Sequence, residues 1–314
     1  MKTETTRNAI IQLVNNWLTA WSSGNEIALH RIFGPDSTFS STAHGVIKGN
    51  LKIASCLIDD CNSCPFLRLN ASNYYISCAD QFTSIATISM YIYGGFQSHL
   101  NFGGTVIASV HIDQSGSWKF AQLTLTVNWM QGDKSLLPYW KYPTENRLWI
   151  QGDPTPLIVS ELDSPWVNSS SIEHSKSKID QITETFSRYS WAIDQADFTL
   201  LQTCFTDDSK GNFPPMGYLN GKHEIIGQLK AFRQIWPWMQ HFGEILNINL
   251  NELENTAQML VGRINTHDML PSINETSYGA HYQLSLRLEA NVWKITNFDY
   301  VPGHFSKTAL LKKS

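Results

Sequence analysis

The stretch ITETFSRYSWAIDQADFTLLQTCF, residues 182–205, repeats the pattern of IIQLVNNWLTAWSSGNEIALHRIF, residues 10–33. Aligned without a gap, the two stretches place Ile182 on Ile10 and Phe205 on Phe33. The same alignment then runs on through Gly217 on Gly45, Gly221 on Gly49 and, after three inserted residues, Trp293 on Trp118. Solenoid repeats are only ~20 to 50 residues long, so a period of this length indicates two copies of a whole domain.

Within each copy, the spacing of apolar residues changes from a helical to a strand period. Three- and four-residue spacing predicts an opening helix in both copies, and short helices are expected over 26–33 and 198–205. In copy two a third helix is expected over 224–236. Period-two alternation then predicts strands at 84–93, 104–112, 118–127, 257–266, 279–289 and 291–301. Helices followed by a segregated sheet with short turns predict an α+β domain with an antiparallel sheet and about three helices.

Composition and the positions of prolines and serines divide the chain into three parts. The first domain is predicted at 1–130 and the second at 179–314, with a Pro/Ser-rich connector at 131–178. The net charge is −4, charged residues make up 16% of the chain, and no apolar run is long enough to span a membrane. These features predict a soluble, cytoplasmic protein that binds neither nucleic acid nor membranes.

Four of the five cysteines lie close together in copy one, and their spacing is similar to that of iron–sulfur ligands. They are Cys56, Cys61, Cys64 and Cys78. The matching stretch of copy two has no cysteine, so buried free thiols are favoured and a metal site is the lesser hypothesis. No metal or cofactor is therefore predicted.

Polar residues present in only one copy are not required by the shared fold and are candidates for function. Copy two has Asp194, His241 and His267 where copy one has Ser22, Leu69 and Gly95. A carboxylate that accepts a hydrogen bond from one imidazole nitrogen raises the basicity of the other, which makes a general base near neutral pH. A second histidine can protonate or polarise a departing oxygen. Each of these residues alone is more often structural, so their convergence is a hypothesis.

These residues, with the predicted element order, resemble the nuclear-transport-factor-2-like superfamily. The motifs are YSWAIDQADF at 189–198, the QHF of 240–242 and the late VWKI of 292–295. They are similar to the SnoaL-like branch, which includes scytalone dehydratase and lindane dehydrochlorinase. The resemblance implies two tandem cone-shaped domains, with Asp194 and His241 as the proton-abstracting pair and His267 as the second histidine. The tyrosine that precedes the aspartate in scytalone dehydratase is Ile193 here, so the same substrate is not implied.

Aromatic residues make up 12% of the chain and suit a pocket for a flat organic ligand. The substrate-binding candidates are Tyr189, Tyr218, Trp236, Tyr282 and Tyr300. The repeat alignment identifies no carboxylate partner for three histidines of copy one, His44, His99 and His111. Copy one is therefore predicted to lack the Asp/His site and to be a structural or lid-forming partner, or a binding domain with different chemistry.

Two functions remain open at this point. The first is a cofactor-independent lyase or isomerase that dehydrates, isomerises or cyclises a small, largely apolar molecule such as a secondary-metabolite intermediate. The second is a non-catalytic small-molecule binding protein with the same pocket. Because domains of this superfamily commonly pair through their sheets, the resemblance also implies an intramolecular pseudo-dimer, with further homo-oligomerisation open.

Overall fold

The computed structural model of the chain describes residues 2–78, 84–96, 99–141, 166, 176–235, 239–266 and 277–312. It divides into two compact units, Met1–Lys176 and Ser177–Ser314. Each unit has a hydrophobic core of its own. None of the described helices is long and apolar enough to cross a membrane.

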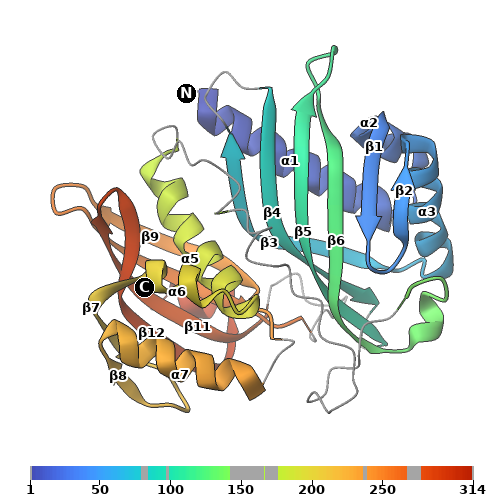
Figure 1. Ribbon diagram of the computed structural model, residues 1–314. Coiled ribbons are helices and arrows are strands. Elements are labelled where there is room, and N and C mark those ends of the chain that lie inside the picture. Colours follow the sequence, from blue (N-terminus) through green and yellow to red (C-terminus); the bar gives the residue numbers. More distant parts are fainter. Residues whose placement is uncertain are drawn as a thin grey trace. The chain divides into compact units, whose positions relative to one another are not determined.

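The two units contain the same succession of elements (Figure 1). Unit 1 has α1 (Lys2–Ser22), α2 (Glu26–Ile32), β1 (Phe33–Ser41), β2 (Gly45–Lys48), α3 (Asn50–Ser63), β3 (Arg68–Cys78), β4 (Ile85–Phe96), β5 (Leu100–Ile112), β6 (Trp118–Gly132) and a 3-10 turn, Lys134–Leu136. Unit 2 has α5 (Lys178–Asp194), α6 (Phe198–Cys204), β7 (Phe205–Asn212), β8 (Tyr218–Asn220), α7 (Lys222–Ile235), β9 (Gly243–Asn251), β10 (Thr256–Ile264), β11 (Ser277–Glu289), β12 (Val292–Ser306) and α8 (Lys307–Leu311).

Each unit forms one six-stranded sheet, and the strand order is the same in both. The orders are β2-β1-β6-β5-β4-β3 and β8-β7-β12-β11-β10-β9. The predicted α+β class with tandem duplication is therefore confirmed. The sheets are mixed, however, because β1 pairs with β6, and β7 with β12, in parallel. The short turns could not predict these pairs, since parallel neighbours are joined by long crossovers and not by hairpins.

Helix α5 lies across one face of the sheet of unit 2 (Figure 1). Its apolar residues Ile182, Phe186 and Tyr189 recur at three- and four-residue spacing and are buried in the core of this unit. From the sheet, Val261 and Tyr282 are buried in the same core. The helix therefore covers the inner face of the strands from which the candidate site is built.

The end of α5 is set by local backbone chemistry. Ala196 has a φ of 57°, a left-handed conformation, at the position where unit 1 has Gly24 with a φ of 64°. Asp197 then caps α6 by accepting a hydrogen bond from the backbone N–H of Leu200 at 2.9 Å. The left-handed residue and the cap turn the chain sharply, so Asp194 is the last helical residue of α5.

A close approach between α5 and β9 depends on a glycine. A Cβ atom placed on Gly243 would overlap the ring of Phe186. Glycine is therefore required for β9 to lie this close to the helix. Because His241 lies two residues before Gly243, this contact also sets how near His241 comes to α5.

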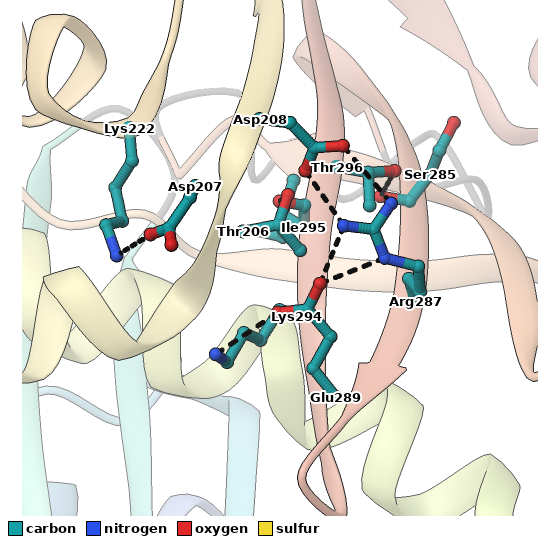
Figure 2. Close-up of polar contacts among 10 residues, drawn as sticks. All are labelled: Thr206, Asp207, Asp208, Lys222, Ser285, Arg287, Glu289, Lys294, Ile295 and Thr296. Atoms are coloured by element: carbon teal, nitrogen blue, oxygen red, sulfur yellow. Dashed lines mark hydrogen bonds and ion pairs between the residues drawn. The ribbon is translucent and has the colours of Figure 1, made fainter.

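A network of ion pairs links β7, β11 and β12 (Figure 2). Arg287 contacts Asp208 at 2.8 Å and Glu289 at 2.6 Å, and Lys294 contacts Glu289 at 3.3 Å. Arg287 occupies an odd-numbered position of β11, whereas the core residues of that strand are even-numbered, such as Tyr282. The network therefore lies on the outer face of the sheet, away from the face that α5 covers.

Candidate functional site

A buried carboxylate and imidazole meet where α5 ends and β9 is about to begin. Asp194 is 4% exposed and His241 is 7% exposed. Oδ1 of Asp194 lies 2.6 Å from Nδ1 of His241, and Oδ2 accepts the backbone N–H of His241 at 2.7 Å. One carboxylate therefore binds both the ring and the main chain of the same histidine.

Arg233 of α7 fixes the helix end that carries Asp194. Its Nε donates to the carbonyl oxygen of Ile193 at 3.0 Å, and its Nη2 donates to that of Asp194 at 2.7 Å. The last carbonyl groups of a helix have no partner within the helix, and a cation at this end also interacts favourably with the helix dipole. Buried Arg233 thus satisfies two carbonyl groups and holds the backbone of Asp194 in place.

Aromatic rings surround the pair. The ring of Tyr189 lies 5.9 Å from that of His241 and 5.0 Å from that of Phe298. The ring of Tyr282 lies 5.4 Å from that of Phe298. Burial, with smaller contributions from Tyr282 and Asp194, raises the pKa of Tyr189 well above its usual range. Its phenol therefore stays protonated and can donate a hydrogen bond near neutral pH.

The structure gathers most, but not all, of the residues expected at this site. Tyr189, Tyr282 and Tyr300 lie together, since the Tyr282 and Tyr300 rings are 5.3 Å apart on neighbouring strands. Tyr218 does not join them, because it lies on the short edge strand β8 and is 63% exposed. His267 and Trp236 fall outside the described residues.

The sequence reasoning missed Arg263, which lies beside these tyrosines. Its Nη1 donates to the hydroxyl oxygen of Tyr300 at 3.2 Å. Two signals in the sequence could have identified it. Arg263 replaces Tyr91 of copy one in the repeat alignment, and it follows Val261 on the apolar side of an alternating strand.

The geometry of Asp194 and His241 suits proton transfer. When the carboxylate accepts the Nδ1–H bond, the neutral ring carries its lone pair on Nε2. The negative charge of Asp194 also stabilises the imidazolium that forms once Nε2 has taken a proton. The pair can thus act as a general base and then return the proton as a general acid.

Unit 1 has an Asp–His pair of its own, so His44 has a carboxylate partner that the repeat alignment does not identify. Nε2 of His44 lies 2.9 Å from Oδ2 of Asp60, and its Nδ1 lies 3.0 Å from the Ser41 hydroxyl oxygen. Asp60 also accepts N–H bonds from two indoles, Trp21 at 3.1 Å and Trp140 at 2.6 Å. Both ring nitrogens of His44 have protein partners, so the arrangement is that of a structural polar network.

The cysteines of unit 1 are all free thiols. Among the described residues, no group of three His, Cys, Asp or Glu side chains is arranged to hold a metal ion. Burial raises the pKa of Cys56 to about 12, with further contributions from Asp60 and Asp59. This thiol therefore stays protonated near neutral pH.

Several solved structures are similar in fold to part of the chain. A hexachlorocyclohexane dehydrochlorinase, LinA type 2, is 15% identical over 41% of this chain and 90% of its own, with a TM-score of 0.36. A candidate scytalone dehydratase from Novosphingobium aromaticivorans is 14% identical over 42% and 90%, with a TM-score of 0.37. A protein of unknown function with a cystatin-like fold from Nostoc punctiforme is 17% identical over 38% and 90%, with a TM-score of 0.35.

No curated protein matches the sequence. Residues 176–299 match the family model described as the SnoaL-like domain. This range contains α5 to β11 and the part of β12 that carries Phe298, and thus both Asp194 and His241. The resemblance inferred from the sequence is therefore confirmed for the second unit, which is similar to the SnoaL-like domain.

Proposed function

We propose that the second unit is a cofactor-independent lyase or isomerase in which His241 removes a proton from a carbon atom of a small, largely apolar substrate. The observation that carries the proposal is the double contact of Asp194 with the backbone and ring of His241. A carboxylate that only neutralised or packed against the ring would not need to fix both groups. Fixing both orients the ring, which a general base requires.

The surroundings of the pair support an apolar substrate with at least one polar group. Aromatic side chains pack in the core beside the pair, and Arg263 and the hydroxyl of Tyr300 are polar groups on the same side of the sheet. Abstraction of a proton from carbon starts dehydration, double-bond migration and ring closure alike. The proposal therefore covers these three reactions as one class, with biosynthetic intermediates as the substrates.

Hydrogen exchange tests the shared first step without knowledge of the product. Purified protein is incubated in deuterium oxide with a panel of cyclic and aromatic ketones, and incorporation at the carbon next to the carbonyl is followed by mass spectrometry. We expect the native chain to accelerate exchange for some members of the panel. Asp194→Asn and His241→Ala should each lower that rate by at least roughly 100-fold, the usual contribution of a general base.

His223→Ala is the matched control, because His223 is exposed near the start of α7, away from the pair. This variant should exchange at the native rate, and circular dichroism should show all three variants folded. Native rates in Asp194→Asn or His241→Ala would contradict the proposal. Ligand binding by the native chain without exchange of any panel member would favour the binding-protein alternative.

A further inference from the structure

Arg263 carries a positive charge on the inner face of the sheet. Ala257, Met259 and Val261 precede it at alternate positions of β10 and are buried in the core of unit 2. The register of β10 with β11 is regular over these residues, so Arg263 projects from the same face. A charged group facing a core is costly unless hydrogen bonds and opposite charge compensate it.

Within the described part of the chain, few of the N–H donors of this guanidinium have a hydrogen-bond acceptor. Arg263 is half-buried, and its one hydrogen bond among the described residues goes to the neutral phenol of Tyr300. A guanidinium has five N–H donors, and among the described residues Arg263 forms no ion pair. Its neighbour across the ladder is Ala280, whose side chain cannot accept a hydrogen bond.

A second unused donor lies beside it. The hydroxyl of Tyr282 is buried and has no hydrogen-bond partner within the described part of the chain. Rings of Phe186, Phe298 and Tyr300 pack around Tyr282 at centroid distances of 5.3, 5.4 and 5.3 Å. Burial raises the pKa of Tyr282, so the hydroxyl keeps its proton. A buried donor without an acceptor is unfavourable unless a bound molecule supplies one.

These donors lie close to the Asp194–His241 pair. Arg263 is the ladder partner of Gly243, two residues after His241, and the backbone N–H of the next residue, Ile264, donates to the carbonyl of Phe242 at 2.9 Å. Burial lowers the pKa of Arg263. The neighbouring Tyr282, Tyr300 and Asp194 raise this pKa by more, so the guanidinium stays charged. The positive charge of Arg263 and the negative charge of Asp194 thus both lie near His241, and the two side chains do not contact each other.

We propose that Arg263, Tyr282 and Tyr300 bind an oxygen atom of the substrate and stabilise the negative charge that this oxygen acquires during the reaction. The proposal rests on the proposed function and narrows its substrates to apolar compounds with a carbonyl group next to the reacting carbon. When the C–H bond breaks, the proton moves to Nε2 of His241. The electron pair forms the C=C bond of an enolate, and the charge moves to the carbonyl oxygen. Preorganised donors at such an oxygen lower the barrier to reaction.

The probe for this site is p-nitrophenol, a flat molecule whose phenolate resembles an enolate and absorbs at a longer wavelength than the phenol. A titration at a pH below the pKa of the free probe should show phenolate absorption on binding to the native chain. Arg263→Met should weaken phenolate binding at least about tenfold, because a charge-assisted donor is lost. Tyr282→Phe should weaken it severalfold and should not destabilise the fold, since that hydroxyl has no protein partner.

Arg287→Met is the matched control, because Arg287 lies on the outer face of the same sheet. It should bind phenolate as the native chain does. The inference is overturned if the native chain binds no phenolate, or if Arg263→Met and Tyr282→Phe both bind it with native affinity. Should Arg263→Met fail to fold, Tyr282→Phe alone decides between these outcomes.

Asp194→Asn separates this inference from the proposed function. Because the variant removes a nearby negative charge, phenolate affinity should stay the same or rise while deuterium exchange is lost. The native chain could bind phenolate in a way that depends on Arg263 and yet exchange no substrate. That result would support the oxygen site and contradict the proposed function. Exchange by the native chain, with phenolate affinity that does not depend on Arg263, would overturn only the oxygen site.

Discussion

At the scale of single residues, Asp60 in unit 1 is a buried carboxylate whose two oxygens both accept hydrogen bonds, as is Asp194 in unit 2. Its two oxygens accept from Trp21, Trp140 and His44, and the carboxylate is 2% exposed. In unit 2 the carboxylate of Asp194 binds both the ring and the backbone N–H of His241. In unit 1 the second nitrogen of the histidine is held by Ser41. The same pair of residue types is thus held by different partners in the two units.

Replacing Asp60 tests this structural role. Asp60→Ala leaves two indole N–H groups and an imidazole buried without their acceptor, and should lower the free energy of unfolding of unit 1 by roughly 3–5 kcal/mol. Asp59→Ala, on the exposed side of the same helix, should change it by less than about 0.5 kcal/mol. Urea unfolding followed by tryptophan fluorescence measures both. Equal stability of the two variants would contradict the network's role.

The sequence indicated the Asp194–His241 pair but not the His44–Asp60 pair, for a definable reason. Asp194 and His241 are polar residues that only copy two has, whereas Asp60 and His44 are polar residues that only copy one has. Asp60 aligns with Phe232 and His44 with Met216, so both also differ between the copies. Distances between residues on different elements remain outside what alignment can show. That His44 reaches Asp60 depends on how the turn after β1 packs against α3.

At the scale of elements, the position of the Asp194–His241 pair depends on how α5 is held at its end. Arg233→Met removes two charged hydrogen bonds to carbonyl groups of that end. We expect a loss of about 2–4 kcal/mol in the free energy of unfolding of unit 2, since hydrogen bonds to charged groups contribute ~1.5–3 kcal/mol each.

The same substitution should also lower the maximal rate of deuterium exchange, because Asp194 is no longer fixed relative to His241. Lys230→Met, an exposed substitution on the same helix, is the control for both measurements. A destabilised variant that still exchanges at the native maximal rate would show that Arg233 supports the helix but does not position the carboxylate.

The outer face of the unit 2 sheet should give a small, acid-sensitive contribution to stability. Hydrogen bonds from Arg287 and Thr206 lower the pKa of Asp208 from 3.8 to about 2, and Arg287 also lowers that of Glu289. A folded pKa below the unfolded one stabilises the fold at pH values above about 4, and this contribution is lost as the pH falls from about 4 to 2.

Because Asp208 is exposed and Glu289 is partly exposed, the network should contribute less than about 1 kcal/mol, and salt should screen it. Urea unfolding of the native chain and of Arg287→Met at pH 6 and pH 3 measures the contribution. The difference between the two proteins should shrink at the lower pH. A difference that does not change with pH would show that packing of the arginine stem, and not its charge, is responsible.

Strands in which apolar and polar residues alternate without a break were predicted from the sequence. A strand whose alternation is interrupted was not. The even-numbered residues from Ala280 to Leu288 gave β11 directly. β1 was not predicted, because Gly34, Pro35 and Asp36 break its pattern. The structure accommodates them in a register shift between Phe33 and Thr38. Such an irregularity is stabilised by tertiary pairing with β6, which local sequence does not encode.

At the scale of the whole molecule, each unit should unfold on its own, since each has a separate core. Calorimetry should then resolve two transitions. Asp60→Ala should lower the temperature of one and Arg233→Met that of the other. A single transition that both substitutions shift equally would show that the units are thermodynamically coupled.

The duplication itself was visible in the sequence because whole elements recur in the same order. The parallel strand pairs were not, since they join residues as distant as Phe205 and Ile295. The difference between the copies was also readable, because one fold has been kept while its buried polar residues changed. Sequence comparison thus located candidate positions, and only packing assigned them to different roles.

The double contact of Asp194 with His241 also bears on the entropy of the reaction. Since one carboxylate fixes both the backbone N–H and Nδ1 of His241, the rotations of the imidazole are restricted before any substrate arrives. That conformational entropy is lost when the chain folds and not again at each turnover. Proton abstraction by His241 should therefore have a small activation entropy, and temperature should change its rate mainly through the activation enthalpy.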